Sequence, residues 1–208
     1  MNKKHRIWMA VAALLLIGVY FFPIWSISME APQYPEGIGM NITVNDIQGK
    51  EFHNLESING LNHYIGMKAI TPESIPELRI MPFIFGFLIV SGLLVAFWGN
   101  RKWIMAWLVF FGLLAIAGLV DFYIWGYDYG HNLSPDAPIK VPGMTYQPPL
   151  IGSKQLLNIN ATSVPHIGFY IALISMGIAG WIWWKAGHGG SSDSGASSQM
   201  KSKQAAAA

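Results

Sequence analysis

Four long apolar runs constrain what this chain can fold into. They cover residues 7–27, 80–98, 103–125 and 165–185. Each is close to the roughly 20 residues that a helix needs to cross a bilayer. Tryptophans gather at or near their ends, as expected of side chains anchored at a membrane interface: Trp98, Trp103, Trp125, Trp181, Trp183 and Trp184. The pattern predicts an all-α membrane protein with four transmembrane helices.

The composition supports a membrane protein and excludes functions that depend on cysteine. Hydrophobic residues make up 52% of the chain and charged residues only 12%, against roughly 25% charged in soluble domains. The chain has no cysteine. This absence excludes disulfides, thiolate metal sites, iron–sulfur ligation and thiol-redox catalysis. It also excludes the four-helix thiol oxidases of bacterial membranes, whose topology is similar.

The distribution of charge predicts the orientation, because cytoplasmic segments of membrane proteins are enriched in Lys and Arg. The segments placed inside carry one acid, Asp193, and eight bases: Lys3, Lys4, Arg6, Arg101, Lys102, Lys185, Lys201 and Lys203. The segments placed outside carry five bases and twice as many acids. We expect both termini to be cytoplasmic in a bacterial inner membrane.

This orientation divides the rest of the chain. A short N-terminus (1–6), a turn (99–102) and a low-complexity tail (186–208) would be cytoplasmic, the tail without a fixed structure. The loops 28–79 and 126–164 would be periplasmic and sizeable. A cleaved signal peptide is the alternative for residues 7–27. That run is long for one, and no clean Ala-x-Ala site follows it.

The two outer loops are expected to pack together into a cap. In the first, residues 54–68 have the apolar spacing of a short helix, and residues 39–47 alternate imperfectly, as a short strand would. The second is rich in proline and glycine, which predicts an irregular cover without long helices.

Two residues of the first loop suggest a metal site. His63 and Met67 stand four residues apart, which on a helix places both side chains on one face. An imidazole beside a thioether suits copper above all. The alternative is that Met67 is packed and His63 makes a local hydrogen bond.

Three further residues on the outer side are weaker candidate ligands: Met81, Asp121 and His131. An acid as deep in a helix as Asp121 is costly unless it is paired or coordinating; the alternative is contact with interfacial water, Arg79 or a loop lysine. His131 could be oriented by Asp128 and neighbouring tyrosines, or it could lie in a plain turn.

Other functions have less support. Of the six histidines none lies in the middle of an apolar run, which disfavours a bis-histidine haem inside the membrane. Nothing polar lines a path through the bilayer midplane, which disfavours a transporter or channel. No nucleophile-and-base motif, phosphate loop or zinc-hydrolase motif is found, so we do not expect an enzyme.

Three segments carry a family resemblance: Leu61–Met67, Asp121–His131 and Val141–Gly152. There the chain resembles small bacterial membrane proteins encoded with the maturation genes of nitrous oxide reductase, a periplasmic copper enzyme of denitrification. The resemblance implies that this chain takes part in the assembly of a copper enzyme. It does not assign metal ligands to particular residues.

The sequence therefore favours an inner-membrane accessory protein that handles copper in the periplasm. Its expected partners are the lipid bilayer and a periplasmic copper protein or maturation complex, with no nucleic acid. A second hypothesis is a metal-free scaffold whose outer loops dock a periplasmic protein or transporter through Tyr34, Tyr129 and Tyr146. A third is an electron-transfer subunit associated with quinone or haem.

Overall fold

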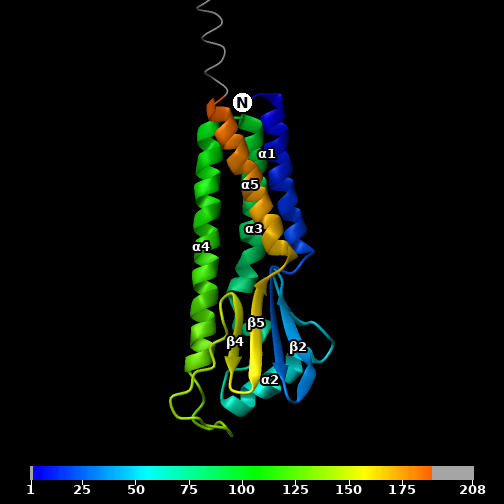
Figure 1. Ribbon diagram of the computed structural model, residues 1–208. Helices are drawn as coiled ribbons and strands as arrows, with labels where there is room; N and C mark the ends of the chain where they lie inside the picture. Colours follow the sequence, from blue (N-terminus) through cyan, green and yellow to red (C-terminus); the bar gives the residue numbers. More distant parts are fainter. Residues whose placement is uncertain (1, 189–208) are drawn as a thin grey trace, which may run out of the picture.

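The structure, a computed structural model that describes residues 2–188, has a helical bundle at one end and a small head at the other (Figure 1). The bundle consists of α1 (Lys3–Leu15), continued by the 3₁₀ helix η1 (Leu16–Tyr20), together with α3 (Glu77–Trp98), α4 (Arg101–His131) and α5 (Ile167–His188). The prediction for the tail from residue 189 onward lies outside the described residues.

Three helices are long and apolar enough to cross a membrane: α3, α4 and α5. The first predicted span, residues 7–27, is shorter than expected, because its helical part ends at Tyr20 and a strand starts at Trp25. Pro23 explains the break, since it lacks an N–H and disfavours helical backbone at the residue before it. Residues 25–29 also alternate in type as a strand does, which a count of apolar residues overlooks.

The head contains a five-stranded antiparallel sheet, so the all-α prediction is wrong. Its strand order is β3-β2-β1-β5-β4. The strands are β1 (Trp25–Ala31), β2 (Tyr34–Ile42), β3 (Ile47–Gly49), β4 (Gly152–Leu156) and β5 (Ile159–Pro165). Strand β1 escaped prediction because it begins inside an apolar run.

The sheet joins the two predicted outer loops. Strand β1 pairs with β5 over the register Trp25↔Pro165 to Glu30↔Asn160, so segments far apart in sequence lie side by side. The second loop is therefore only in part the irregular cover that was predicted. Helix α4 continues to His131, and β4 and β5 form a hairpin. The irregular part of the loop is the segment 132–151, which connects α4 to this hairpin.

Two apolar cores hold the molecule together. One lies among the bundle helices, with Met9, Leu16, Leu88 and Ile104 fully buried or nearly so. The other lies in the head, between one face of the sheet, helix α2 (Asn54–Ile65) and the outer end of α4. In it the Trp25 indole packs against the rings of Phe122 and Phe169, at 5.2 and 5.6 Å between ring centroids, and donates a 2.7 Å hydrogen bond to Ser163 Oγ.

Candidate metal-binding pocket in the head

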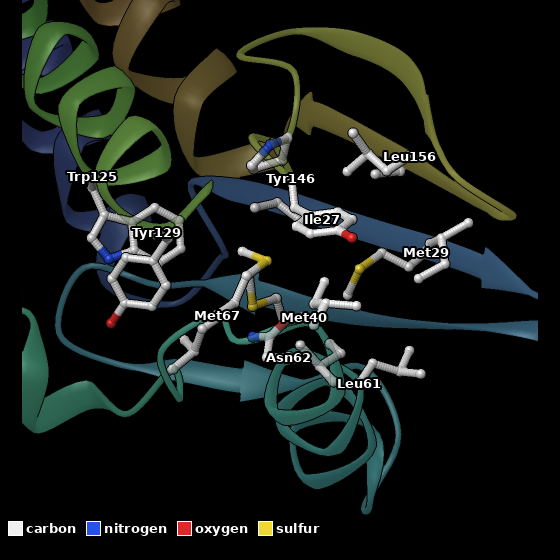
Figure 2. Close-up of a pocket in the computed structure, with 16 residues that line it drawn as sticks. Ile27, Met29, Met40, Leu61, Asn62, Met67, Trp125, Tyr129, Tyr146 and Leu156 are labelled. Carbon is white, nitrogen blue, oxygen red and sulfur yellow. The ribbon is translucent and has the colours of Figure 1, made fainter. Parts of the chain in front are cut away.

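The head core contains a small, partly open cavity of about 50 Å³ (Figure 2). We call it the head pocket. Its walls come from the sheet, α2, the outer end of α4 and the segment 132–151, and almost all of their surface is apolar. Three methionines from separate parts of the chain line it: Met29, Met40 and Met67.

Strand pairing places the first two methionines. Met29 shares a face of β1 with Trp25 and Ile27, because side chains two residues apart in a strand point the same way. Ile27 pairs directly with Met40 of β2, which puts that thioether on the same face. Met40 is 2% exposed. Figure 2 shows the side chains of both methionines pointing into the head pocket.

The end of α2 places the third methionine. Gly66 adopts a left-handed conformation (φ 80°) and ends the helix, as glycine commonly does. The N–H of Met67 then donates to Asn62 O at 2.9 Å, and its side chain turns inward onto the head core. Met67 therefore lines the head pocket together with the two sheet methionines, and its side chain points into that pocket (Figure 2).

The segment 132–151 covers the pocket, with Tyr146 and Pro148 among its lining residues. Backbone hydrogen bonds fix this cover at three points: Ser134 N–H to Gly66 O, Ile139 N–H to Tyr64 O, and Tyr146 N–H to Gly130 O, all between 2.8 and 2.9 Å. At the third point a Cβ on Gly130 would lie 2.3 Å from the Gln147 nitrogen. Only glycine allows this approach of the cover to α4.

Two buried polar groups at the pocket make no hydrogen bond within residues 2–188, the Trp125 indole N–H and the Tyr146 hydroxyl. The Tyr146 side chain is 3% exposed. The other phenol that lines the pocket is satisfied: Tyr129 Oη donates to Ala69 O at 3.3 Å and lies 3.2 Å from Ser74 Oγ. A free hydroxyl at the wall can bond to an occupant or to a water beside it.

The charges nearest the pocket lie at its rim and neutralise each other. Lys68 follows Met67 and pairs with Asp128 of α4 at 2.6 Å. Its hydrogen bond, with a second from Asn132, lowers the pKa of the Asp128 carboxyl. The Lys68 ammonium also lies 6.0 Å from the centroid of the Tyr129 ring. The pocket itself is lined by no histidine, carboxylate, lysine or arginine.

The structure does not bring the predicted pair together in one site. Met67 lines the head pocket, whereas His63 is exposed on α2, with its ring beside that of Tyr64. In residues 2–188 no group of three or more His, Asp or Glu side chains is placed to hold a metal ion.

The three weaker candidates lie in other surroundings. Met81 packs between the two cores near the start of α3. Asp121 is half-buried on α4, and neither ion pair found in the described part of the chain involves it. His131 stacks on Tyr127 at 3.8 Å between ring centroids and shares a 3.0 Å hydrogen bond with the Tyr127 carbonyl. It is thus held within α4 by Tyr127, not by Asp128.

The ligand set predicted from the sequence does not include Met29 and Met40. Their signal was present, since Trp25, Ile27 and Met29 alternate with serines and a glutamate, and Met40 lies in a second alternating stretch. Helical spacing does not relate these two residues to each other, because a strand places its side chains on one face with a period of two.

The tyrosines proposed as docking anchors are mostly unavailable. Tyr129 and Tyr146 are 6% and 3% exposed, because both form walls of the head pocket, and Tyr34 is only partly exposed. The exposed aromatics of the head are instead Phe52 and Tyr64, at 93% and 55%.

Neither protein-family models nor curated proteins give a match to this chain.

Proposed function

We propose that this chain is an inner-membrane accessory protein that handles copper at the outer face of the membrane and assists the assembly of a periplasmic copper enzyme. The resemblance to proteins of nitrous oxide reductase maturation makes that enzyme the first client to test. The chain's role would be binding and transfer, without catalysis.

The observation that carries the proposal is that three thioethers line one small, partly open cavity. Thioethers are soft ligands and select copper in its reduced state over magnesium, calcium or zinc. Met29, Met40 and Met67 come from two strands and a helix terminus, and all three line the head pocket. A carrier needs such a site on the side of the membrane where its client matures.

Four spans with both termini inside would put the head in the periplasm. Helix α1 and η1 together cover 18 residues, Lys3–Tyr20, or about 30 Å at the rises of the two helix types. This length matches the hydrocarbon core of a bilayer. The N-terminus and the end of α5 lie at the bundle end opposite the head (Figure 1).

Basic residues close the bundle at the end proposed to be cytoplasmic. The Arg6 guanidinium donates to the carbonyls of Ala96 and Phe97 near the end of α3. Arg101 Nε donates to Trp183 O at 3.2 Å, and its guanidinium lies 4.6 Å from the centroid of the Trp183 ring. Cations that bind the last carbonyls of a helix stabilise that terminus.

The test is the copper content of the client enzyme in cells. In a denitrifying bacterium that lacks this chain, we expect nitrous oxide reductase to reach the periplasm with much less copper, and a plasmid copy of the wild-type chain to restore it. A fully loaded client in the deletion strain, at limiting copper, would contradict the proposal. It would favour the metal-free scaffold, with Phe52 and Tyr64 as its exposed aromatic contacts.

A further inference from the structure

We infer that the head pocket binds one monovalent soft cation, Cu(I), through the thioethers of Met29, Met40 and Met67, beneath the cover formed by residues 132–151. The inference rests on the proposed function and deepens it, because it names the ion's charge state and its ligands. It replaces the predicted set of His63, Met67, Met81, Asp121 and His131 and retains only Met67.

The cavity separates a binding site from ordinary core packing. Methionines often fill gaps in cores, where they leave no space, and protein interiors have few voids larger than a water molecule. Here the thioethers of three methionines face one cavity of about 50 Å³. That volume holds an ion with a water, and is far below the roughly 300 Å³ at which pockets for organic cofactors begin.

The ligand chemistry selects the metal. Every sulfur in this chain belongs to a methionine, because the chain has no cysteine. The pocket walls offer neither imidazole nor carboxylate, so zinc, magnesium, calcium and Cu(II) lack the nitrogen or oxygen ligands that they prefer. Three thioethers leave Cu(I), or its heavier analogue Ag(I), as the ion that this wall can bind.

The electrostatics select a single positive charge. Transfer of an ion into an apolar environment is unfavourable, and this penalty grows with the square of the charge. No anionic side chain lines the pocket to offset a second charge. The rings of Trp125 and Tyr129 do line it, and aromatic faces attract cations. A monovalent ion is therefore favoured over a divalent one.

The cover gives the site a way to exchange its ion. Tyr146 and Pro148 line one side of the pocket, and the segment that carries them forms no helix or strand over residues 132–151. Hydrogen bonds to Gly66, Tyr64 and Gly130 fix it at separate points. Movement of the stretch near Tyr146 would widen the access of an incoming ligand to the sulfurs.

The test is a Cu(I) competition titration of the full-length protein in detergent, with a chromophoric Cu(I) chelator under anaerobic conditions. We expect one Cu(I) per chain for the wild type. Met29→Leu, Met40→Leu and Met67→Leu should each weaken binding about tenfold or more, and the triple variant should lose it. Leucine keeps the volume of methionine, so these changes preserve the core.

Two control variants separate this site from the predicted one. Met81→Leu removes a partly buried thioether that does not line the pocket, and His63→Ala/His131→Ala removes the two candidate imidazoles. Both should bind Cu(I) as the wild type does. Loss of binding in the histidine variant, or full binding in the triple methionine variant, would overturn the inference.

The pH dependence of the affinity gives an independent readout on the wild type. Metal ligands that carry a proton lose affinity as the pH falls, whereas a thioether has no proton to lose. The only titratable groups at the wall are the phenols of Tyr129 and Tyr146, and the nearest charges are the paired Lys68 and Asp128. The Cu(I) affinity should stay constant from about pH 7.5 to pH 5, across the usual titration range of histidine. A steep fall would indicate imidazole ligands and overturn the inference.

A last measurement needs no substitution. With ¹³C-labelled methionine methyl groups and Ag(I) as a diamagnetic probe, the NMR signals of Met29, Met40 and Met67 should shift together at one equivalent, while those of Met81 and Met144 stay in place. Shifts confined to other methionines would overturn the site.

In cells, a triple methionine variant that fully restores client copper would overturn this inference and leave the proposed function standing. The opposite result is also possible: the wild-type chain binds Cu(I) in this pocket, but deletion of the chain leaves the client fully loaded. That result would overturn the proposed function and leave this inference standing.

Discussion

The hydroxyl of Tyr146 is the clearest single-residue feature of the head pocket. It is buried without a hydrogen-bond partner in the described chain, and a buried polar group left unpaired is destabilising. The sequence could not identify it, because Tyr146 lies in a proline-rich segment whose coil path is fixed by distant contacts to Gly130, Tyr64 and Gly66.

Removal of this hydroxyl should therefore not destabilise the ion-free protein. We expect Tyr146→Phe to leave the free energy of unfolding unchanged or to raise it by up to about 1 kcal/mol, measured by thermal or denaturant unfolding in detergent. Tyr129→Phe is the control, since its hydroxyl is bonded, and should destabilise by about 1 kcal/mol. If Tyr146→Phe lowered the free energy of unfolding by more than Tyr129→Phe does, the Tyr146 hydroxyl would have a hydrogen-bond partner.

The ion pair at the pocket rim predicts a pH effect. Lys68 and Asn132 lower the pKa of Asp128 in the folded chain. A carboxyl with a lowered folded pKa stabilises the fold at pH values above its unfolded pKa of about 3.9, and this contribution disappears as the pH falls through the folded pKa. The ¹³C titration of the Asp128 carboxyl should have its midpoint below about 3.9, and Lys68→Gln should move that midpoint upward. Equal midpoints in the two proteins would refute the role of Lys68.

At the scale of elements, helix α2 shows what the sequence could predict. Its apolar spacing predicted a helix over residues 54–68, and the structure has one over Asn54–Ile65. The end is three residues earlier because Gly66 adopts a positive φ, and that difference decides where Met67 points. The strands were harder to predict, since the pairing of β1 with β5 joins segments more than a hundred residues apart and depends on tertiary contacts.

Two glycines of this region should respond oppositely to alanine. A Cβ at Gly66 would lie 2.8 Å from Ala137 Cβ and 3.1 Å from Ser134 N, and the positive φ adds further strain. We expect Gly66→Ala to destabilise the protein by about 2–3 kcal/mol and to weaken Cu(I) binding. Gly60 is the control, because a Cβ there would contact nothing within 4 Å. Gly60→Ala should stabilise α2 by up to about 1 kcal/mol. If unfolding midpoints show equal effects for the two changes, the proposed helix end is wrong.

At the scale of the whole molecule, the chain combines a membrane bundle with a head that is connected to it by very short segments. Strand β1 follows η1 after a short turn, and β5 leads into α5. Met81 packs against both cores. The apolar runs predicted three of the bundle helices because length and hydropathy alone specify a membrane-spanning helix. The head could not be predicted in the same way, because its pocket forms only when three separate segments fold together.

The proposed orientation can be measured cleanly, because the chain has no cysteine. Ser153→Cys introduces a single thiol on exposed β4 of the head, and Lys102→Cys introduces one at the exposed start of α4. In intact cells whose outer membrane is permeable, a membrane-impermeant maleimide should label the first variant and leave the second unlabelled until the inner membrane is disrupted. Labelling of the Lys102→Cys variant alone would invert the topology and place the head in the cytoplasm.

The central claim, a soft cation held by three thioethers in the head, is tested most directly by X-ray absorption at the copper edge of the Cu(I)-loaded full-length protein. We predict an edge typical of Cu(I) and a ligand shell dominated by three sulfur atoms. The multiple-scattering features of imidazole should be absent. A shell of nitrogen and oxygen, or one with clear imidazole features, would contradict the account and direct the search back to His63 and His131.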